Sequence, residues 1–259
     1  MFDRYLKFAK EIALEAGNIM LKYYNGGESH YKEDNTIVTI ADKEINDYLI
    51  ERVKLEFPEH SVDGEESDFG DTRYKWICDP IDGTAMYARH IPTCVFSLAL
   101  VVDGTPLVTV VYDPFNKDLY SAVKGQGAYK NEVPITVNND DFDNMKSIIN
   151  LDTWPFWAYD MTEAYNEINK YTYSLSLGSV ARACMCVASG EFVAAVFPGG
   201  HDIYCDVAAA KLIIEEAGGV VTNLFGYDQR YDQDIKGVIA SNKVVYNKIL
   251  EIVSKYVKE

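Results

Sequence analysis

The chain has 259 residues, of which 48% are hydrophobic, and it carries a formal net charge of −16. This size and apolar content suit one large globular domain or two closely packed halves. The excess of carboxylates argues against nucleic acid as a ligand, because binding to a phosphate backbone needs clustered lysine and arginine. Phosphorylated small molecules remain candidates, since bound metal ions can reverse the charge locally.

The cysteines and the N-terminus predict a cytoplasmic protein that has no contact with a membrane. The five cysteines are dispersed and include no C-x-x-C pair, so neither a zinc site nor a disulfide framework is indicated. Buried free thiols in a reducing compartment are expected instead. No run of about 18 apolar residues occurs, and the first residues lack the basic-then-apolar pattern of a signal peptide.

Hydrophobic spacing in residues 1–140 predicts a helix pair followed by an antiparallel meander sheet. Helices are expected over residues 2–24 and 42–57, the first ended by Gly26-Gly27 and the second by Pro58. A short strand is expected between them at residues 37–40. The meander strands are expected at residues 76–78, 95–103, 107–113, 119–123 and 127–129, with turns at 104–106 and 131–132.

Residues 141–259 predict alternating strands and helices. The polar residues 138–141 predict a connector between the two halves. Strands are expected at residues 147–151, 171–175, 192–197, 220–221 and 238–240, and helices at 158–170, 178–189, 206–217 and 243–256. A meander followed by this alternation predicts a single domain over residues 1–259 with a layered α+β fold.

An aspartate-rich turn, Asp79-Pro80-Ile81-Asp82-Gly83-Thr84, gathers groups suited to metal-assisted phosphate chemistry. Asp79 is expected to end the strand at 76–78, because Pro80 cannot continue a hydrogen-bonded ladder. Gly83 and Thr84 would offer backbone N–H groups at the start of a short helix, and such groups attract phosphate. Carboxylates beside a phosphate would repel it unless cations lie between them, and oxygen ligands favour Mg²⁺ or Mn²⁺.

Several motifs resemble those of the inositol monophosphatase superfamily. They occur in the family's order between residues 38 and 219, so the resemblance covers nearly the whole chain: Val38-Thr39-Ile40-Ala41-Asp42, Gly64-Glu65-Glu66, the aspartate-rich turn, Gly178-Ser179 before Cys184, and Asp206-Val207-Ala208-Ala209-Ala210 followed by Glu216-Ala217-Gly218-Gly219. The resemblance implies an α-β-α-β-α layered sandwich that is usually dimeric. It also implies magnesium-dependent, lithium-inhibited hydrolysis of a phosphate monoester.

The resemblance also implies roles for individual residues. Two or three Mg²⁺ ions per site are implied: one held by Glu65, Asp79 and the Ile81 carbonyl, a second held by Asp79, Asp82 and Asp206, and a third, weaker one to which Glu65 contributes. Asp42 and Thr84 would orient the attacking water, while Glu65 would serve catalysis through its metal ions. Substrate contacts are implied for Asp82, Asp206 and the backbone N–H groups of Gly83 and Thr84.

Elementary chemistry is consistent with these roles. A phosphate monoester dianion repels hydroxide, and two metal ions about 3.5–4 Å apart can stabilise the attacking and leaving oxygens together. Asp79, as a bridging ligand, and Asp82 are placed to hold such a pair. Asp206 is expected to begin a helix, where the dipole favours a carboxylate. The simpler alternatives are that Asp206 only caps this helix and that Asp42 is only a first-turn acid.

Some residues depart from the family pattern or leave their role open. Ala85-Met86-Tyr87 follows the aspartate-rich turn, and Cys205 stands where a tryptophan is common. Asp202 either replaces a substrate-reading glutamate or belongs to a loop turn. Arg182 could bind a second phosphate, a carboxylate or a sugar hydroxyl, or it could be a surface or dimer contact.

A lysine and an aromatic cluster each allow two interpretations. Lys32 could steady a loop over the third metal ion or be a solvated charge. The aromatic cluster Trp154-Pro155-Phe156-Trp157 fits the core or a dimer interface better than a substrate platform.

These observations predict a cytoplasmic, homodimeric phosphatase for a small phosphorylated metabolite, with inositol 1-phosphate or another polyol phosphate as the leading substrate. Histidinol phosphate, fructose 1,6-bisphosphate and 3′-phosphoadenosine 5′-phosphate stay open. A regulatory protein that keeps the fold is the alternative from another class, since some superfamily members partner with the transcription machinery. A calcium-binding module is disfavoured because the D-x-D-x-D-G spacing is lacking.

Overall fold

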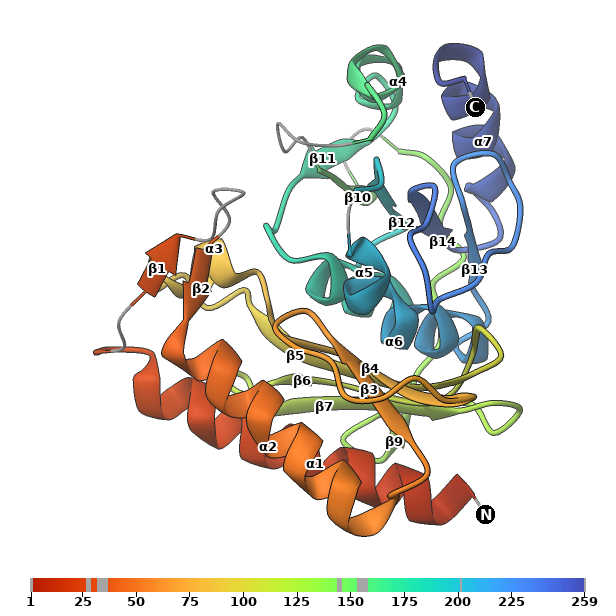
Figure 1. The fold of residues 1–259 in the computed structure, drawn as a ribbon. Helices are drawn as coiled ribbons and strands as arrows, with labels where there is room; N and C mark the ends of the chain where they lie inside the picture. Colours follow the sequence, from red (N-terminus) through yellow and green to blue (C-terminus); the bar gives the residue numbers. More distant parts are fainter. Residues whose placement is uncertain are drawn as a thin grey trace.

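Layers of helices and sheets alternate in the computed structural model: a helix pair, a large sheet, a second helix pair, a small sheet and an outer helix pair (Figure 1). The structure describes residues 2–26, 29–31, 37–143, 146–152, 158–200 and 202–258. The expected α-β-α-β-α sandwich is therefore confirmed. Within these ranges, no helix combines the length and the apolar character that crossing a membrane requires.

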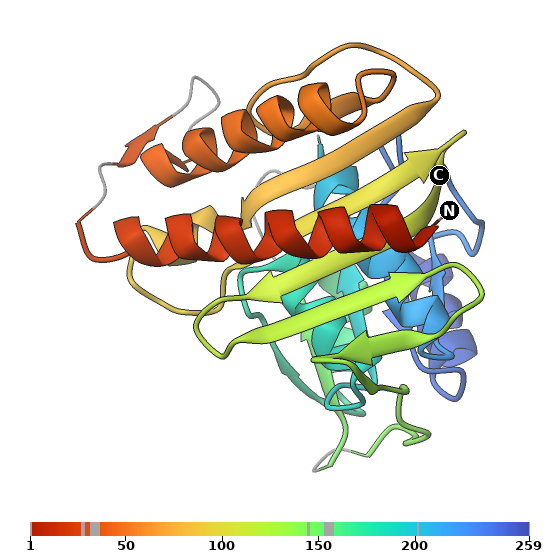
Figure 2. The ribbon, with the colours of Figure 1, turned by 90° about the horizontal axis from the view of Figure 1, so that it is seen from below.

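The first layer consists of α1 (Phe2–Tyr23) and α2 (Ile40–Glu56), which lie across the outer face of the large sheet (Figure 2). The inward stripe of α1 has helical spacing, and Ile12, Ala16 and Met20 on it are fully buried. Burial of this stripe against the sheet fixes α1, so the helix expected over residues 2–24 is confirmed.

A two-stranded antiparallel ribbon leads into α2. It pairs β1 (Ser29–Tyr31), which the sequence did not predict, with β2 (Ile37–Thr39), which it did. Thr39 then caps α2, because its hydroxyl accepts the Ala41 N–H at 3.2 Å. With this cap α2 begins two residues before the expected position.

The large sheet has seven strands in chain order: β3 (Ser61–Gly64), β4 (Tyr74–Asp82), β5 (Val95–Val102), β6 (Thr105–Asp113), β7 (Asp118–Val123), β8 (Ala128–Lys130) and β9 (Val133–Pro134). β3 is parallel to β4, and the other pairs are antiparallel. The expected meander is confirmed, whereas β3 and β9 were not predicted.

Two hairpin turns of this sheet have positive φ at both central residues. The predicted turn at Asn131 and Glu132 is confirmed, with φ of 49° and 65°. The other turn lies at Asp103 and Gly104, with φ of 53° and 82°, one residue before the prediction. Two-residue hairpin loops favour this backbone geometry, so Thr105 already pairs with β5.

The end of β4 differs from the prediction, and the difference shapes the aspartate-rich turn. Asp79 pairs with Ser97, and pairing resumes at Asp82 opposite Val95. Two residues of β4 therefore face one residue of β5 in a β-bulge. Pro80, which has no N–H, lies inside the bulge, where its missing donor breaks no regular ladder bond. The strand continues past Asp79 to Asp82 because the bulge accommodates the proline.

The small sheet has five strands in the order β11 (Tyr173–Leu175), β10 (Ile148–Leu151), β12 (Ala194–Phe197), β14 (Val238–Ser241) and β13 (Val220–Thr222). β10 is parallel to β11 and β12, whereas β14 is antiparallel to β12 and β13. Its outer face carries α4 (Thr162–Ile168) and α7 (Tyr246–Tyr256). Between the two sheets lie α5 (Val180–Ala188) and α6 (Ile203–Glu216) (Figure 1).

Side-chain hydrogen bonds near two helix starts shift them from their predicted positions. Asp160 accepts the Thr162 N–H at 2.9 Å, and α4 begins there instead of at residue 158. The side chain of Asn242 accepts the N–H groups of Val244 and Val245 at 2.9 and 3.0 Å, which closes a turn and delays α7 from 243 to 246. Such local bonds compete with the helical ones.

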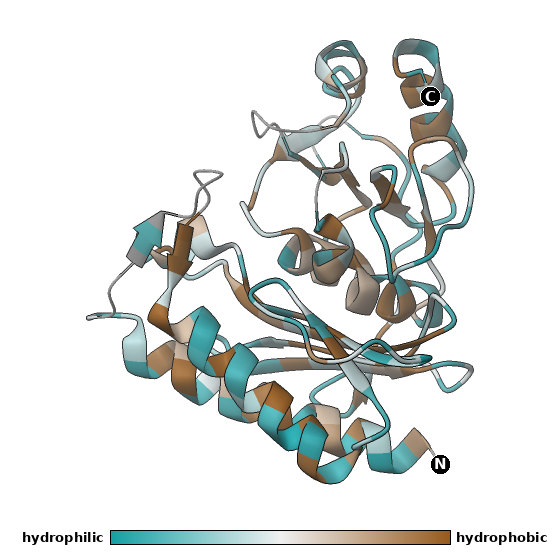
Figure 3. Ribbon diagram, in the orientation of Figure 1, coloured by the Kyte–Doolittle hydropathy of each residue, from teal (hydrophilic) through white to brown (hydrophobic). Residues whose placement is uncertain are grey.

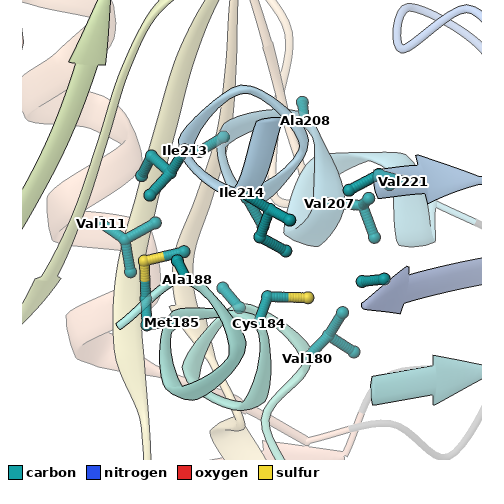
Figure 4. Packing of buried hydrophobic residues seen from close by; sticks show 14 of the residues in the cluster. Val111, Val180, Cys184, Met185, Ala188, Val207, Ala208, Ile213, Ile214 and Val221 are labelled. Atoms are coloured by element: carbon teal, nitrogen blue, oxygen red, sulfur yellow. The ribbon is translucent and has the colours of Figure 1, made fainter. Parts of the chain in front are cut away.

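The core between the sheets is built around α5 and α6. Figure 4 shows Met185 of α5 beside Val111 of the large sheet, and Val207 of α6 beside Val221 of the small sheet. Apolar residues gather on the faces that the layers turn toward one another (Figure 3). All five cysteines are in the described part of the chain, where they are buried and form no disulfide, as expected.

Candidate metal centre

Three aspartates from distant parts of the sequence meet beside the bulge. One carboxylate oxygen from each of Asp79, Asp82 and Asp206 lies within 4.8 Å of the other two. The first two come from the end of β4 and the third from the first turn of α6. Asp79 and Asp82 are buried, and Asp206 is half-buried. The structure therefore brings together three of the residues predicted to bind metal.

The position of Asp206 within α6 corrects one expectation. α6 begins at Ile203, so Asp206 is its fourth residue and does not begin the helix. Asp202 takes the N-cap position with a φ of 58°, and its N–H donates to Asp234 at 3.2 Å. The alternative that Asp206 is only an N-cap is thereby excluded. Asp202 belongs to the turn before the helix.

Burial and mutual repulsion work against ionisation of this cluster. Burial raises the pKa of Asp79 well above its usual range, and the charges of Glu65 and Asp206 raise it further. The pKa of Asp206 is also raised, first by burial and then by Asp82. Closely spaced carboxylates of this kind are stabilised in their charged form by a cation between them.

Asp82 is held by the N-terminus of α5. Its Oδ2 accepts the Ser179 hydroxyl and the Ala181 N–H, both at 2.6 Å, and its Oδ1 accepts the Val180 N–H at 3.1 Å. Burial raises the pKa of Asp82, and these bonds oppose that rise, so the pKa settles at about 6. The carboxylate thus joins β4 of the large sheet to α5 in the middle layer.

Close packing explains Gly83 in the turn. Its φ is 90°, and an added Cβ would lie 3.0 Å from both the Gly178 carbonyl oxygen and the Ser179 Cβ. The bulge and the α5 loop therefore touch backbone to backbone. Gly83 is also the N-cap of the short helix α3 (Thr84–Tyr87), which confirms the helix start expected there.

The Ile81 carbonyl, expected to bind a metal, already accepts a bond from inside the turn. Thr84 donates its hydroxyl to this oxygen at 2.9 Å. The Ile81 N–H in turn donates to Oδ1 of Asp79 at 2.9 Å. Since a carbonyl oxygen has two lone pairs, one is left for a further partner.

Asp42 lies at the third position of α2 and is fully buried. Its Oδ2 accepts the Thr39 N–H at 2.7 Å and the Thr39 hydroxyl at 2.6 Å. Its Oδ1 has no hydrogen-bond partner among the described residues. Burial, opposed by the Thr39 bonds and assisted by the charges of Glu65 and Glu66, raises its pKa to about 7. Buried polar atoms without protein partners often bind water or an ion.

Glu65 lies on the loop after β3, where its N–H donates to the Cys78 carbonyl at 3.1 Å. Its charge raises the pKa of Asp42, Asp79 and Asp206, which places it within electrostatic reach of all three. The five predicted carboxylates, Asp42, Glu65, Asp79, Asp82 and Asp206, therefore belong to one neighbourhood.

Asn46 holds the loop that carries Glu65, a role that was not predicted from the sequence. Its Nδ2 donates to the Ser67 carbonyl at 3.1 Å and to the Ser67 hydroxyl at 2.6 Å. A Cβ added to Gly64 would lie only 2.1 Å from Oδ1 of Asn46. This close approach explains why a glycine precedes Glu65. The available signal was spacing, because Asn46 follows Asp42 by four residues and so shares its helix face.

Arg182 contacts the large sheet. Its Nε lies 3.5 Å from Oδ2 of Asp113, a buried carboxylate at the end of β6, and its Nη1 donates to the Tyr120 hydroxyl at 3.4 Å. The Arg182 guanidinium therefore has an acidic and a hydroxyl partner within the protein itself. Lys32 and the aromatic cluster at 154–157 lie outside the described residues.

Comparisons with known proteins agree with this geometry. The model of the inositol monophosphatase family matches residues 1–258. The chain is 29% identical over 258 residues to an inositol monophosphatase of Mesembryanthemum crystallinum, covering 95% of this chain and 94% of that one. It is 31% identical over 232 residues to the Nus factor SuhB of Escherichia coli, covering 85% of each chain. A solved inositol monophosphatase from Anabaena has a TM-score of 0.81 and 28% identity, covering 98% of this chain and 97% of that one.

Proposed function

Since this chain belongs to the inositol monophosphatase family, we propose that it is a magnesium-dependent phosphatase that hydrolyses a small phosphate monoester, inositol 1-phosphate or a related polyol phosphate. One observation carries the proposal: the cluster of buried Asp79 and Asp82 with half-buried Asp206, in which one oxygen from each residue lies within 4.8 Å of the other two. Ionised carboxylates packed this closely are unfavourable unless divalent cations neutralise them.

The residues present fit such ions. Carboxylates and a carbonyl form an all-oxygen donor set, which suits Mg²⁺ and also Mn²⁺. Glu65, Asp79 and the Ile81 carbonyl would hold one ion, Asp79, Asp82 and Asp206 a second, and Glu65 would contribute to a weaker third. When bound, the ions would neutralise the phosphate oxygens and lower the pKa of a bound water.

The remaining groups act on the water and the phosphate. The unpartnered Oδ1 of Asp42 and the hydroxyl of Thr84 would orient the attacking water. A carboxylate whose pKa is about 7 can accept a proton near neutral pH. The backbone N–H groups of Gly83 and Thr84, next to the carboxylates of Asp82 and Asp206, would position the substrate. This arrangement needs no covalent enzyme intermediate.

The proposal also covers the substrate class and the oligomeric state. We expect a cytoplasmic homodimer that acts on a small phosphorylated metabolite and binds no nucleic acid. Arg182 would favour a bisphosphate if it turned to the substrate, but its contacts with Asp113 and Tyr120 hold it against the large sheet and so lend no support to a bisphosphate. Histidinol phosphate, fructose 1,6-bisphosphate and 3′-phosphoadenosine 5′-phosphate remain the rival substrates.

The likeness to a Nus factor favours one second candidate, a regulatory role through a protein partner. The cluster speaks against a purely regulatory role, because a binding surface has no need of three closely spaced carboxylates with raised pKa values, two of which are buried. Asp206→Asn separates the two functions. Its effect on the fold should be small, since Asp206 is half-buried. A phosphatase loses turnover in this variant, whereas partner binding survives.

The test is phosphate release from a panel of the four named substrate types with Mg²⁺, in the presence and absence of Li⁺. One substrate hydrolysed far faster than the others and inhibited by Li⁺ is the expected result, with Asp206→Asn inactive. Glu251→Gln, which changes an exposed carboxylate of α7, serves as the control and should be fully active. No release from any substrate by a protein that binds Mg²⁺ would contradict the phosphatase function for this panel.

A further inference from the structure

A hydrogen bond joins the two segments that carry Glu65 and Asp206. The Tyr204 hydroxyl donates to Oδ1 of Asp63 at 2.9 Å. Tyr204 lies in the first turn of α6, two residues before Asp206, and Asp63 lies in β3, two residues before Glu65. The bond therefore connects elements that are 141 residues apart in sequence and that supply ligands to the proposed metal centre from different sides.

The β3 side of this bond needs an anchor. β3 is an edge strand, and it pairs through Asp63 with Ile77 and through Gly64 with Cys78 of β4. Glu65 then leaves the strand, and the Asn46 bonds to Ser67 hold the loop from the α2 side. From the α6 side, Tyr204 holds Asp63 in β3, two residues before Glu65. The segment bearing Glu65 is thus fixed between two helices.

The α6 side benefits from the same bond. α6 starts from Asp202, a non-glycine residue with a φ of 58°, so its first turn follows a strained backbone position. A tyrosine has few rotatable bonds and a rigid ring. Once its hydroxyl is bound to Asp63, Tyr204 fixes the distance between this first turn and β3, and hence between Asp206 and Glu65.

We propose that Tyr204 and Asp63 form a positioning pair that holds Glu65 and Asp206 at the spacing the metal ions require. The inference rests on the proposed function and adds to it two residues that contact neither metal nor substrate. Groups that orient metal ligands commonly change metal affinity by 10-fold or more when they are removed, roughly the effect expected here.

The decisive variant is Tyr204→Phe, which removes only the hydroxyl. Mn²⁺ binding to the substrate-free protein, followed by the electron paramagnetic resonance signal of free Mn²⁺, should weaken by roughly 10-fold. The Mg²⁺ concentration for half-maximal phosphatase activity should rise in parallel, while the KM at saturating Mg²⁺ stays within about twofold, because the pair does not contact substrate.

Two comparisons separate positioning from a general loss of stability. Tyr246→Phe removes another partly buried tyrosine hydroxyl, which bonds Thr222 at 3.2 Å far along the chain in α7, and should leave Mn²⁺ binding unchanged. Asp63→Asn keeps an oxygen that accepts the Tyr204 hydroxyl, so it should bind Mn²⁺ more tightly than Asp63→Ala. This second pair decides the matter if Tyr204→Phe fails to fold.

The outcomes distinguish this inference from the proposed function. If the unmodified protein binds no Mn²⁺ and releases no phosphate, the proposed function is wrong and the positioning pair is wrong with it. If the unmodified protein binds and hydrolyses normally but Tyr204→Phe binds Mn²⁺ equally well, only the positioning pair is wrong. Equal weakening in Tyr246→Phe would also overturn it.

Discussion

At the scale of single residues, Asp42 combines a helix cap with an unpartnered oxygen in one carboxylate. Its Oδ2 accepts the N–H and the hydroxyl of Thr39, whereas its Oδ1 is buried without a partner among the described residues. The sequence alone allowed Asp42 to be merely a first-turn acid. Its pKa of about 7 is far from what capping bonds alone would produce, because those bonds lower a carboxyl pKa.

Asp42→Asn tests whether this residue serves catalysis. The amide oxygen can still accept the Thr39 N–H, so the cap is retained, but no proton can be accepted from water. We expect kcat to fall by about 100-fold or more while stability at pH 8 does not fall, because an uncharged group replaces a buried carboxylate. Steady-state kinetics and thermal melting measure the two effects.

Asp47→Asn, an exposed change on the same helix, provides the control and should alter neither kcat nor stability. A kcat for Asp42→Asn close to that of the control would show that Asp42 is only a cap.

Asn46→Ala tests the anchor of the Glu65 loop. The change removes the two hydrogen bonds that Asn46 donates to Ser67. At roughly 0.5–1.5 kcal/mol for each bond, the free energy of unfolding should fall by about 1–3 kcal/mol. Mn²⁺ affinity should fall as well, because Glu65 is no longer held. Chemical denaturation and metal titration measure the two effects.

Asn18→Ala removes an exposed asparagine bond to Glu15 and should change stability by less than about 0.5 kcal/mol. Unchanged Mn²⁺ affinity in Asn46→Ala would mean that the loop keeps its position without this anchor.

At the scale of elements, periodicity predicted most helices and the meander, but not the features that build the site. Proline was expected to end β4 at Asp79, whereas the strand continues through a bulge to Asp82. A bulge depends on the partner strand, here on Val95 and Ser97, and local sequence carries no such information. β3 was missed for the same reason, because a four-residue edge strand is stabilised by its neighbour more than by its own pattern.

Gly83→Ala tests the contact between the bulge and the α5 loop. A Cβ there would be strained by the left-handed backbone conformation. It would also lie 3.0 Å from atoms of Gly178 and Ser179. Gly125 has a φ of 78°, and nothing lies within 4 Å of a Cβ added to it. Gly125→Ala therefore reports the backbone strain alone, about 1–2 kcal/mol. We expect Gly83→Ala to cost at least about 2 kcal/mol and to abolish activity, as measured by denaturation and phosphate release. Equal costs in the two variants would mean that the contact is not tight.

At the scale of the whole molecule, the candidate site lies where the layers meet. Asp82 joins the large sheet to α5, and the bond between Tyr204 and Asp63 joins it to α6. The sequence order of the motifs predicted which residues would gather, but not these connections, because each depends on the packing of remote elements. The layered fold thus brings residues that lie far apart in sequence to one place. The protonation of their carboxyl groups therefore affects the stability of the fold.

This coupling predicts how the metal-free protein responds to pH. The pKa of Asp42 is raised from 3.8 to about 7 and that of Asp82 from 3.8 to about 6. At a pH between 3.8 and these raised pKa values, the folded state binds more protons than the unfolded state. The free energy of unfolding must therefore fall as pH rises from about 4 to about 7. A tenfold change in the proton affinity of one carboxyl corresponds to about 1.4 kcal/mol, so the two carboxyls together change stability by several kcal/mol.

Bound Mg²⁺ should reverse the trend, because the cation favours the ionised carboxylates and binds only when they are deprotonated. The melting temperature of the metal-free protein should therefore decline between pH 5 and pH 8, while the increase caused by millimolar Mg²⁺ should grow over the same range. Scanning calorimetry at several pH values, with and without Mg²⁺, measures both trends. If Mg²⁺ stabilised the protein equally at pH 5 and pH 8, its binding would not involve these carboxylates, and the proposed metal centre would lie elsewhere.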